Sequence, residues 1–148
     1  MIEQAIAACI FIAAQNYSVP PAVLMGIAEV EGGRIGQQVK NSNNTYDLGP
    51  MQINTIWLPE LAKHWRVNKK AAWRLVRDDA CVNMNVAAWI LRRKANQAGS
   101  LYDGIAHYHS KTPKFGKPYR NKVIAVMHKH GLIKKRAFKP SKMAYLTP

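Results

Sequence analysis

Pro20-Pro-Ala-Val-Leu-Met-Gly-Ile-Ala-Glu-Val-Glu-Gly-Gly33 and Asn41-Ser-Asn-Asn-Thr-Tyr-Asp-Leu-Gly-Pro-Met-Gln-Ile-Asn54 are the two segments that decide this fold. The first segment predicts an apolar helix, which begins at a proline pair that a first turn tolerates. The glycine pair at positions 32 and 33 then ends this helix. The second segment is rich in Asn and Gly, so it predicts irregular backbone with a short hairpin at most. A carboxylate at the end of an apolar helix is therefore followed by a polar loop.

Helical periodicity dominates the rest of the chain, so the predicted fold class is mainly α, with a minor irregular or β lobe after the second helix. The other helices are expected at residues 3–16, 55–64 (interrupted by Pro59), 69–77, 79–97, 100–108 and 119–130, with a loop at 110–118. We expect one domain over residues 1–131, followed by a basic C-terminal tail over residues 132–148.

The composition is that of an ordered globular protein with a strongly basic surface. Of its 148 residues, 48% are hydrophobic, and 22 Lys and Arg stand against 8 Asp and Glu, which gives a formal net charge of +14. Such a surface attracts polyanions. The basic residues are spread along the chain and no nucleic-acid-reading motif is present, so nucleic acid is not the expected partner. No apolar run is long enough to span a membrane, and no export signal is expected in this chain.

Two glutamates end the second helix, and helical geometry separates their roles. Residues two apart project about 200° apart, so Glu29 and Glu31 cannot share a site. Glu31 follows Leu24, Ile27 and Ala28 on the apolar face, whereas Glu29 is better placed for solvent. Burial and the negative end of the helix dipole both raise the pKa of a carboxyl group there. Glu31 is therefore a candidate proton donor of the kind that glycosidic bond cleavage requires.

Further candidates lie in the polar loop and in the last helices. Asp47 is either a turn residue before a glycine or a second carboxylate across a cleft. Gln52 and Asn54 are candidates for hydrogen bonds to N-acetyl groups, or parts of an ordinary strand. Tyr108 and Tyr119 are candidates to stack on sugar rings, or core residues.

Neither the histidines nor the cysteines indicate a metal site. The pairs at 107/109 and 128/130 point their rings apart in a helix, so no metal is expected. From the residues alone, Cys9 and Cys81 are compatible with one disulfide or with two buried thiols.

These motifs resemble the lysozyme-like lytic transglycosylases, particularly the small specialised enzymes of type III and type IV secretion, conjugation and pilus assembly. The resemblance covers residues 4–126 and rests on Glu31-Gly-Gly33, Gly49-Pro-Met-Gln-Ile53, Ala106-His-Tyr-His109 and Tyr119. Residues 79–91 also resemble this branch, which often pairs a cysteine there with one in the first helix. The resemblance thus implies a Cys9–Cys81 disulfide.

The resemblance implies a lysozyme-like bilobal α-helical domain that cleaves peptidoglycan between N-acetylmuramic acid and N-acetylglucosamine and leaves a 1,6-anhydro end. Enzymes of this family need no metal or other cofactor, so none is expected here. The resemblance also implies a periplasmic or secreted protein, whose partners are glycan strands and components of a secretion, conjugation or pilus machine. Glu31 takes the catalytic position and Asp47 is the second carboxylate. The candidate substrate-binding residues are Tyr46, Met51, Gln52, Asn54, Tyr108, His109 and Tyr119.

Three departures from the family pattern keep other readings open. Gly32 replaces a serine, Pro50 replaces a leucine, and His109 replaces an asparagine. Moreover, Thr45-Tyr-Asp-Leu-Gly49 resembles the animal-type lysozymes, whose second carboxylate falls on Asp47. A hydrolytic lysozyme is therefore an alternative, and a basic wall-binding or nucleic-acid-binding module without catalysis is an alternative of another class.

Overall fold

The computed structural model describes residues 4–134, and within that range the chain is mainly α-helical, as predicted. The described elements are α1 (Gln4–Tyr17), α2 (Pro21–Glu31), β1 (Gln38–Lys40), β2 (Tyr46–Leu48), β3 (Ile53–Asn54), the 3-10 helix η1 (Thr55–Trp57), α3 (Leu58–Trp65), α4 (Lys69–Asp78), α5 (Ala80–Ala98), α6 (Leu101–His109) and α7 (Pro113–Lys129).

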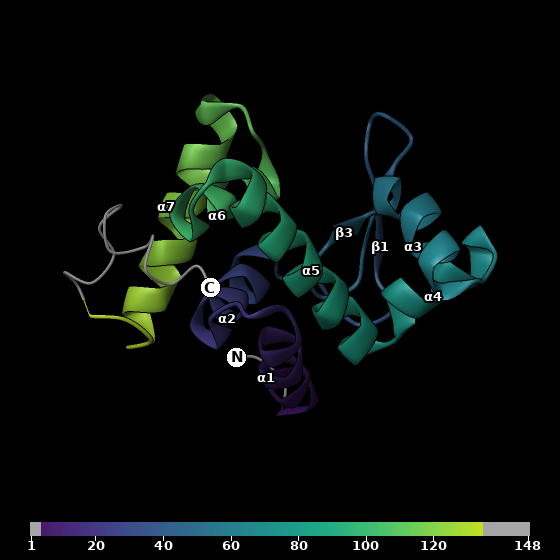
Figure 1. The fold of residues 1–148 in the computed structure, drawn as a ribbon, viewed down its shortest axis with the longest axis horizontal. Coiled ribbons are helices and arrows are strands. Elements are labelled where there is room, and N and C mark those ends of the chain that lie inside the picture. Colours follow the sequence, from purple (N-terminus) through teal and green to yellow (C-terminus); the bar gives the residue numbers. More distant parts are fainter. Residues whose placement is uncertain (1–3, 135–148) are drawn as a thin grey trace.

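Helix α5 crosses the middle of the molecule and joins two lobes (Figure 1). On one side, α1 and α6 pack on α5, while α7 packs on both α6 and α2. On the other side lie the three strands, with α3 and α4 beside them. This is the bilobal arrangement that the resemblance implied.

Helix α5 owes its central place to an apolar face that neighbours cover on several sides. Its start is capped by the Asp79 carboxylate, which accepts a hydrogen bond from the backbone N–H of Val82. Its buried residues recur at helical spacing: Met84, Val86, Ala87, Ala88, Ile90, Leu91 and Ala95. Asn83 is also fully buried on this helix, and its side chain serves the site described below.

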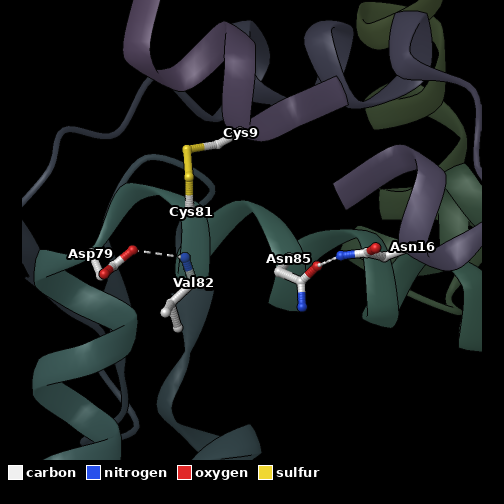
Figure 2. Close-up of a disulfide and its surroundings, with 6 residues drawn as sticks. All are labelled: Cys9, Asn16, Asp79, Cys81, Val82 and Asn85. Carbon is white, nitrogen blue, oxygen red and sulfur yellow. Dashed lines mark hydrogen bonds between the residues drawn. A yellow bond between two sulfur atoms is a disulfide. The ribbon is translucent and has the colours of Figure 1, made fainter. Parts of the chain in front are cut away.

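The structure forms the Cys9–Cys81 disulfide, which fastens α1 to the start of α5 (Figure 2). One turn farther along, the Asn16 side-chain amide donates to Asn85 Oδ1 at 3.0 Å. The disulfide closes a loop with a sequence separation of 72 residues, so it strongly restricts the unfolded chain.

The strands form an antiparallel sheet in the order β1-β2-β3, in which Asp47 pairs with Val39 on one side and Asn54 on the other. Strand alternation sends Tyr46 and Leu48 to one face and Asp47 to the opposite face. Leu48 is fully buried, and the Tyr46 ring lies against Trp73 of α4 with ring centroids 5.1 Å apart. The predicted hairpin is therefore extended by one short third strand.

Two predictions about prolines are wrong. Pro59 does not interrupt a helix, because it lies in the first turn of α3, where its missing N–H costs nothing. The predicted loop at 110–118 is shorter, because Pro113 opens α7 and Pro118 lies inside that helix.

The predicted tail, residues 132–148, falls almost entirely outside the described residues. Of its first residues, Leu132 and Ile133 are partly buried and pack against the core. Within the described part of the chain, no helix has the length and apolarity needed to cross a membrane.

Candidate active site

Glu31 is the last residue of α2, and the end of that helix aims it into the molecule. Gly32 adopts a left-handed conformation (φ 63°), and its N–H donates to the Ala28 carbonyl at 2.9 Å, which ends the helix. Leu24 and Ile27 are fully buried on the same helix face, and Glu31 itself is half-buried. Glu29 is exposed and pairs with His130 Nε2 at 2.6 Å. The predicted difference in exposure between the two glutamates is confirmed.

The surroundings of Glu31 favour its neutral form. Burial raises the pKa of Glu31 from 4.5 to about 7. A hydrogen bond from the Tyr119 hydroxyl to Glu31 Oε1, 2.9 Å long, acts in the opposite direction, and the negative charge of Asp47 raises the pKa further. Near neutral pH, the carboxyl group therefore populates both forms, so it can first donate and then accept a proton.

Aromatic rings from α6 and α7 form a wall beside this carboxyl group. The Tyr119 ring is buried and stacks with His109 (centroids 4.7 Å apart) and with Tyr108 (6.4 Å apart). The Tyr108 hydroxyl donates to the Met51 carbonyl at 3.4 Å. Burial and the charge of Glu31 raise the pKa of both tyrosines, so both keep their hydroxyl protons and act as donors. The wall thus holds one oxygen of Glu31 in place.

Asp47 lies on the sheet within electrostatic reach of Glu31, and Asn54 holds it. The Asn54 amide donates to Asp47 Oδ1 at 3.1 Å and to Thr45 Oγ1 at 3.0 Å. Its oxygen accepts from the backbone N–H of Ile56 at 2.9 Å. Because these bonds occupy both amide hydrogens, Asn54 orients Asp47 and is not free to donate to a sugar.

Asn83 is a supporting residue that the sequence reasoning missed. Its fully buried amide donates to the carbonyls of Leu48 and Val76, each at 2.9 Å, and its oxygen accepts from the N–H of Met51 at 2.9 Å. These bonds fix the loop between β2 and β3 against α5. In the sequence, Asn83 could have been noticed as a polar residue within the apolar stripe of α5.

Two glycines bring the end of α2 against this loop. A Cβ at Gly33 would lie 2.1 Å from the Gly49 carbonyl oxygen, and the Gly33 N–H donates to the Pro50 carbonyl at 3.2 Å. Gly49 has φ +66°, and a Cβ there would lie 2.5 Å from Asn83 Nδ2. Gln52 also supports the loop, because its side-chain amide donates to the Gly49 carbonyl at 3.0 Å.

The structure brings together five of the predicted site residues: Glu31, Asp47, Tyr108, His109 and Tyr119. Besides the role of Asn54, two further expectations need correction. The Met51 side chain is fully buried and does not line a groove, although its carbonyl supports Tyr108. Tyr46 lies on the opposite face of β2 from Asp47, against Trp73, because side chains alternate along a strand.

A hollow of about 310 Å³ opens beside Glu31 on the α7 side. It is lined by Val30, Glu31, His109, Lys114, Phe115, Pro118, Tyr119 and Lys122. Among residues 4–134, no group of three His, Cys, Asp or Glu side chains is placed to hold a metal ion. The arrangement is suited to general acid–base chemistry by one carboxyl group, with a second carboxylate nearby.

Residues 8–123 match a protein-family model described as the transglycosylase SLT domain. No curated protein matches the chain.

Proposed function

Because the chain belongs to the transglycosylase SLT domain family, we propose that it is a peptidoglycan lytic transglycosylase that leaves 1,6-anhydro ends. The family supports peptidoglycan cleavage of the lytic transglycosylase type in general. The bond that we propose is the one between N-acetylmuramic acid and N-acetylglucosamine. One observation carries the proposal: Glu31 is half-buried, bonded to Tyr119, and has a pKa of about 7.

In the first step, neutral Glu31 donates its proton to the bridging oxygen as the bond to C1 of the muramic acid breaks. Tyr119 occupies Oε1 of the carboxyl group, so Oε2 is left to face the substrate. In the second step, the resulting carboxylate takes the proton of the sugar's own 6-hydroxyl, and that oxygen bonds to C1. A group with a pKa near the working pH suits both transfers, and no water is consumed.

Asp47 assists electrostatically in this scheme. Positive charge develops at C1 as the bond breaks, and a fixed carboxylate nearby stabilises it. The bond from Asn54 orients Asp47 before substrate arrives. The same placement favours a second candidate, a hydrolytic lysozyme in which Asp47 acts on C1 or on a water molecule.

We further propose that the protein works in the periplasm or outside the cell, on glycan strands beside an envelope-spanning secretion, conjugation or pilus machine. The Cys9–Cys81 disulfide supports an oxidising compartment. The net charge of +14 supports attraction to an anionic wall, and the basic residues of the tail 132–148 would contribute to it.

A matched pair of variants tests the catalytic assignment. Glu31→Gln keeps the size of the side chain and an acceptor for Tyr119 but removes the proton, so release of fragments from purified cell-wall sacculi should fall by about 10³-fold. Glu29→Gln makes the same change two residues away, at an exposed side chain, and should keep most activity.

Active Glu31→Gln, or inactive Glu29→Gln, would refute the assignment of the proton donor. Wild-type protein that binds sacculi but releases nothing would instead support the alternative of a binding module without catalysis.

A further inference from the structure

The hollow beside Glu31 is charged in a way that the two-step mechanism does not use. Lys114 and Lys122 both line it, eight residues apart on α7, which is about 12 Å along a helix axis. Within residues 4–134 neither lysine forms an ion pair. The one carboxyl group in the lining is Glu31, which is only partly ionised near neutral pH because its pKa is raised to about 7. The hollow therefore holds two positive charges against at most one negative charge.

An exposed aromatic ring lies at the same place. Phe115 is 55% exposed, and the Lys114 ammonium lies 5.8 Å from the centre of its ring. The start of α7 that carries both residues is firmly seated, because Gly116 packs so closely that a Cβ there would lie 2.4 Å from the Ser110 carbonyl oxygen. The hollow thus presents an apolar surface and two cations from a rigid backbone, which suits a ligand with both methyl groups and carboxylates.

We propose that this hollow binds the peptide stem attached to N-acetylmuramic acid, with Lys114 and Lys122 pairing with its carboxylates and Phe115 contacting its alanine methyl groups. The inference rests on the proposed function and adds a substrate class to it: glycan that still carries charged peptide stems. The position supports this occupant, because the N-acetylmuramic acid whose bond at C1 breaks beside Glu31 is the sugar that carries the stem.

A double variant with a charge-matched control tests the proposal. Lys114→Gln with Lys122→Gln removes both cations of the hollow. Lys117→Gln with Lys129→Gln removes two exposed cations of the same helix that do not line it. The substrates are native glycan strands, strands stripped of peptide by an amidase, and strands whose carboxylates are neutralised with carbodiimide and methylamine.

On native strands, the hollow variant should lose about tenfold in kcat/KM, as expected for two partly exposed ion pairs, and the control should lose little. On stripped strands, the hollow variant and wild type should be equal. On neutralised strands, wild type should fall to the level of the variant. Equal activity of variant and wild type on native strands would overturn the proposal. An equal loss on stripped strands would also overturn it, since the lysines would then act on the glycan itself.

A binding measurement separates this proposal from the proposed function, because it does not require cleavage. A soluble stem peptide titrated into isotope-labelled protein should shift the backbone amide signals of Lys114, Phe115 and Lys122. Inorganic phosphate at the same ionic strength should not reproduce those shifts. Absent shifts with the peptide, or identical shifts with phosphate, would refute a peptide site. Cleavage without anhydro products would refute only the proposed function.

Discussion

Replacing Glu31 by Gln should stabilise the protein, and only above the ordinary pKa of a glutamate. The folded state raises the pKa of Glu31 from 4.5 to about 7, mainly by burial. Below about pH 4 the group is neutral in both folded and unfolded states, so it contributes no difference. Between about pH 4.5 and pH 7 the unfolded state is ionised while the folded state still holds its proton, so the free energy of unfolding falls progressively, by about 3 kcal/mol in all. Glutamine is neutral at every pH and still accepts a hydrogen bond from Tyr119.

Urea unfolding of wild type and Glu31→Gln between about pH 4 and pH 8 measures this effect. The two proteins should have nearly the same stability at the acid end, and the variant should become about 3 kcal/mol more stable as pH rises from about 4.5 to about 7. Glu29→Gln serves as control, because Glu29 is exposed, and its difference from wild type should not follow this curve. A difference between Glu31→Gln and wild type that does not change with pH would refute the raised pKa of Glu31.

Three further predictions follow from the contacts around the site. Asp47→Asn should slow cleavage by about 10²-fold. It should also move the Glu31 limb of the pH–rate profile to lower pH, because a charge that raises the Glu31 pKa is gone. An unchanged profile would contradict the electrostatic coupling between Asp47 and Glu31. Reduction of the Cys9–Cys81 disulfide should lower the free energy of unfolding by about 4 kcal/mol, whereas a variant with both cysteines changed to serine should not respond to reductant in thermal melts. Asn83→Ala should cost about 3 kcal/mol or more in urea unfolding, since it removes three buried hydrogen bonds to the backbone. Asn85→Ala, which removes one exposed hydrogen bond, should cost far less, and equal losses would argue against the buried support.

The orientation of the catalytic candidate could be predicted from the sequence because it depends on local geometry. Helical periodicity alone separates Glu31 from Glu29, and the glycines at 32 and 33 determine where the helix ends. The Cys9–Cys81 pairing came from the family resemblance. The residues alone left it open, because spacing cannot say which cysteines meet in space.

The parts that sequence reasoning missed depend on tertiary contacts. Asn83 is a polar residue in an apolar stripe. Its hydrogen bonds to the backbone form only when the loop between β2 and β3 lies against α5. The resemblance places Tyr46 among the substrate-binding residues, but the strand register decides its face, and a shift of one residue moves a side chain to the other face. The early start of α7 was missed because Pro118 suggested a loop, whereas the helix accommodates it after a start at Pro113.

The most direct test of the account is the chemical identity of the new sugar ends. Purified sacculi digested with wild-type protein in oxygen-labelled water can be examined by mass spectrometry of the released fragments. If Glu31 works through the substrate's own 6-hydroxyl, the ends should be 1,6-anhydro sugars that carry no label from water. Reducing ends that contain the label as the main product would contradict the account and assign the protein to the hydrolytic, lysozyme-like alternative that uses Asp47.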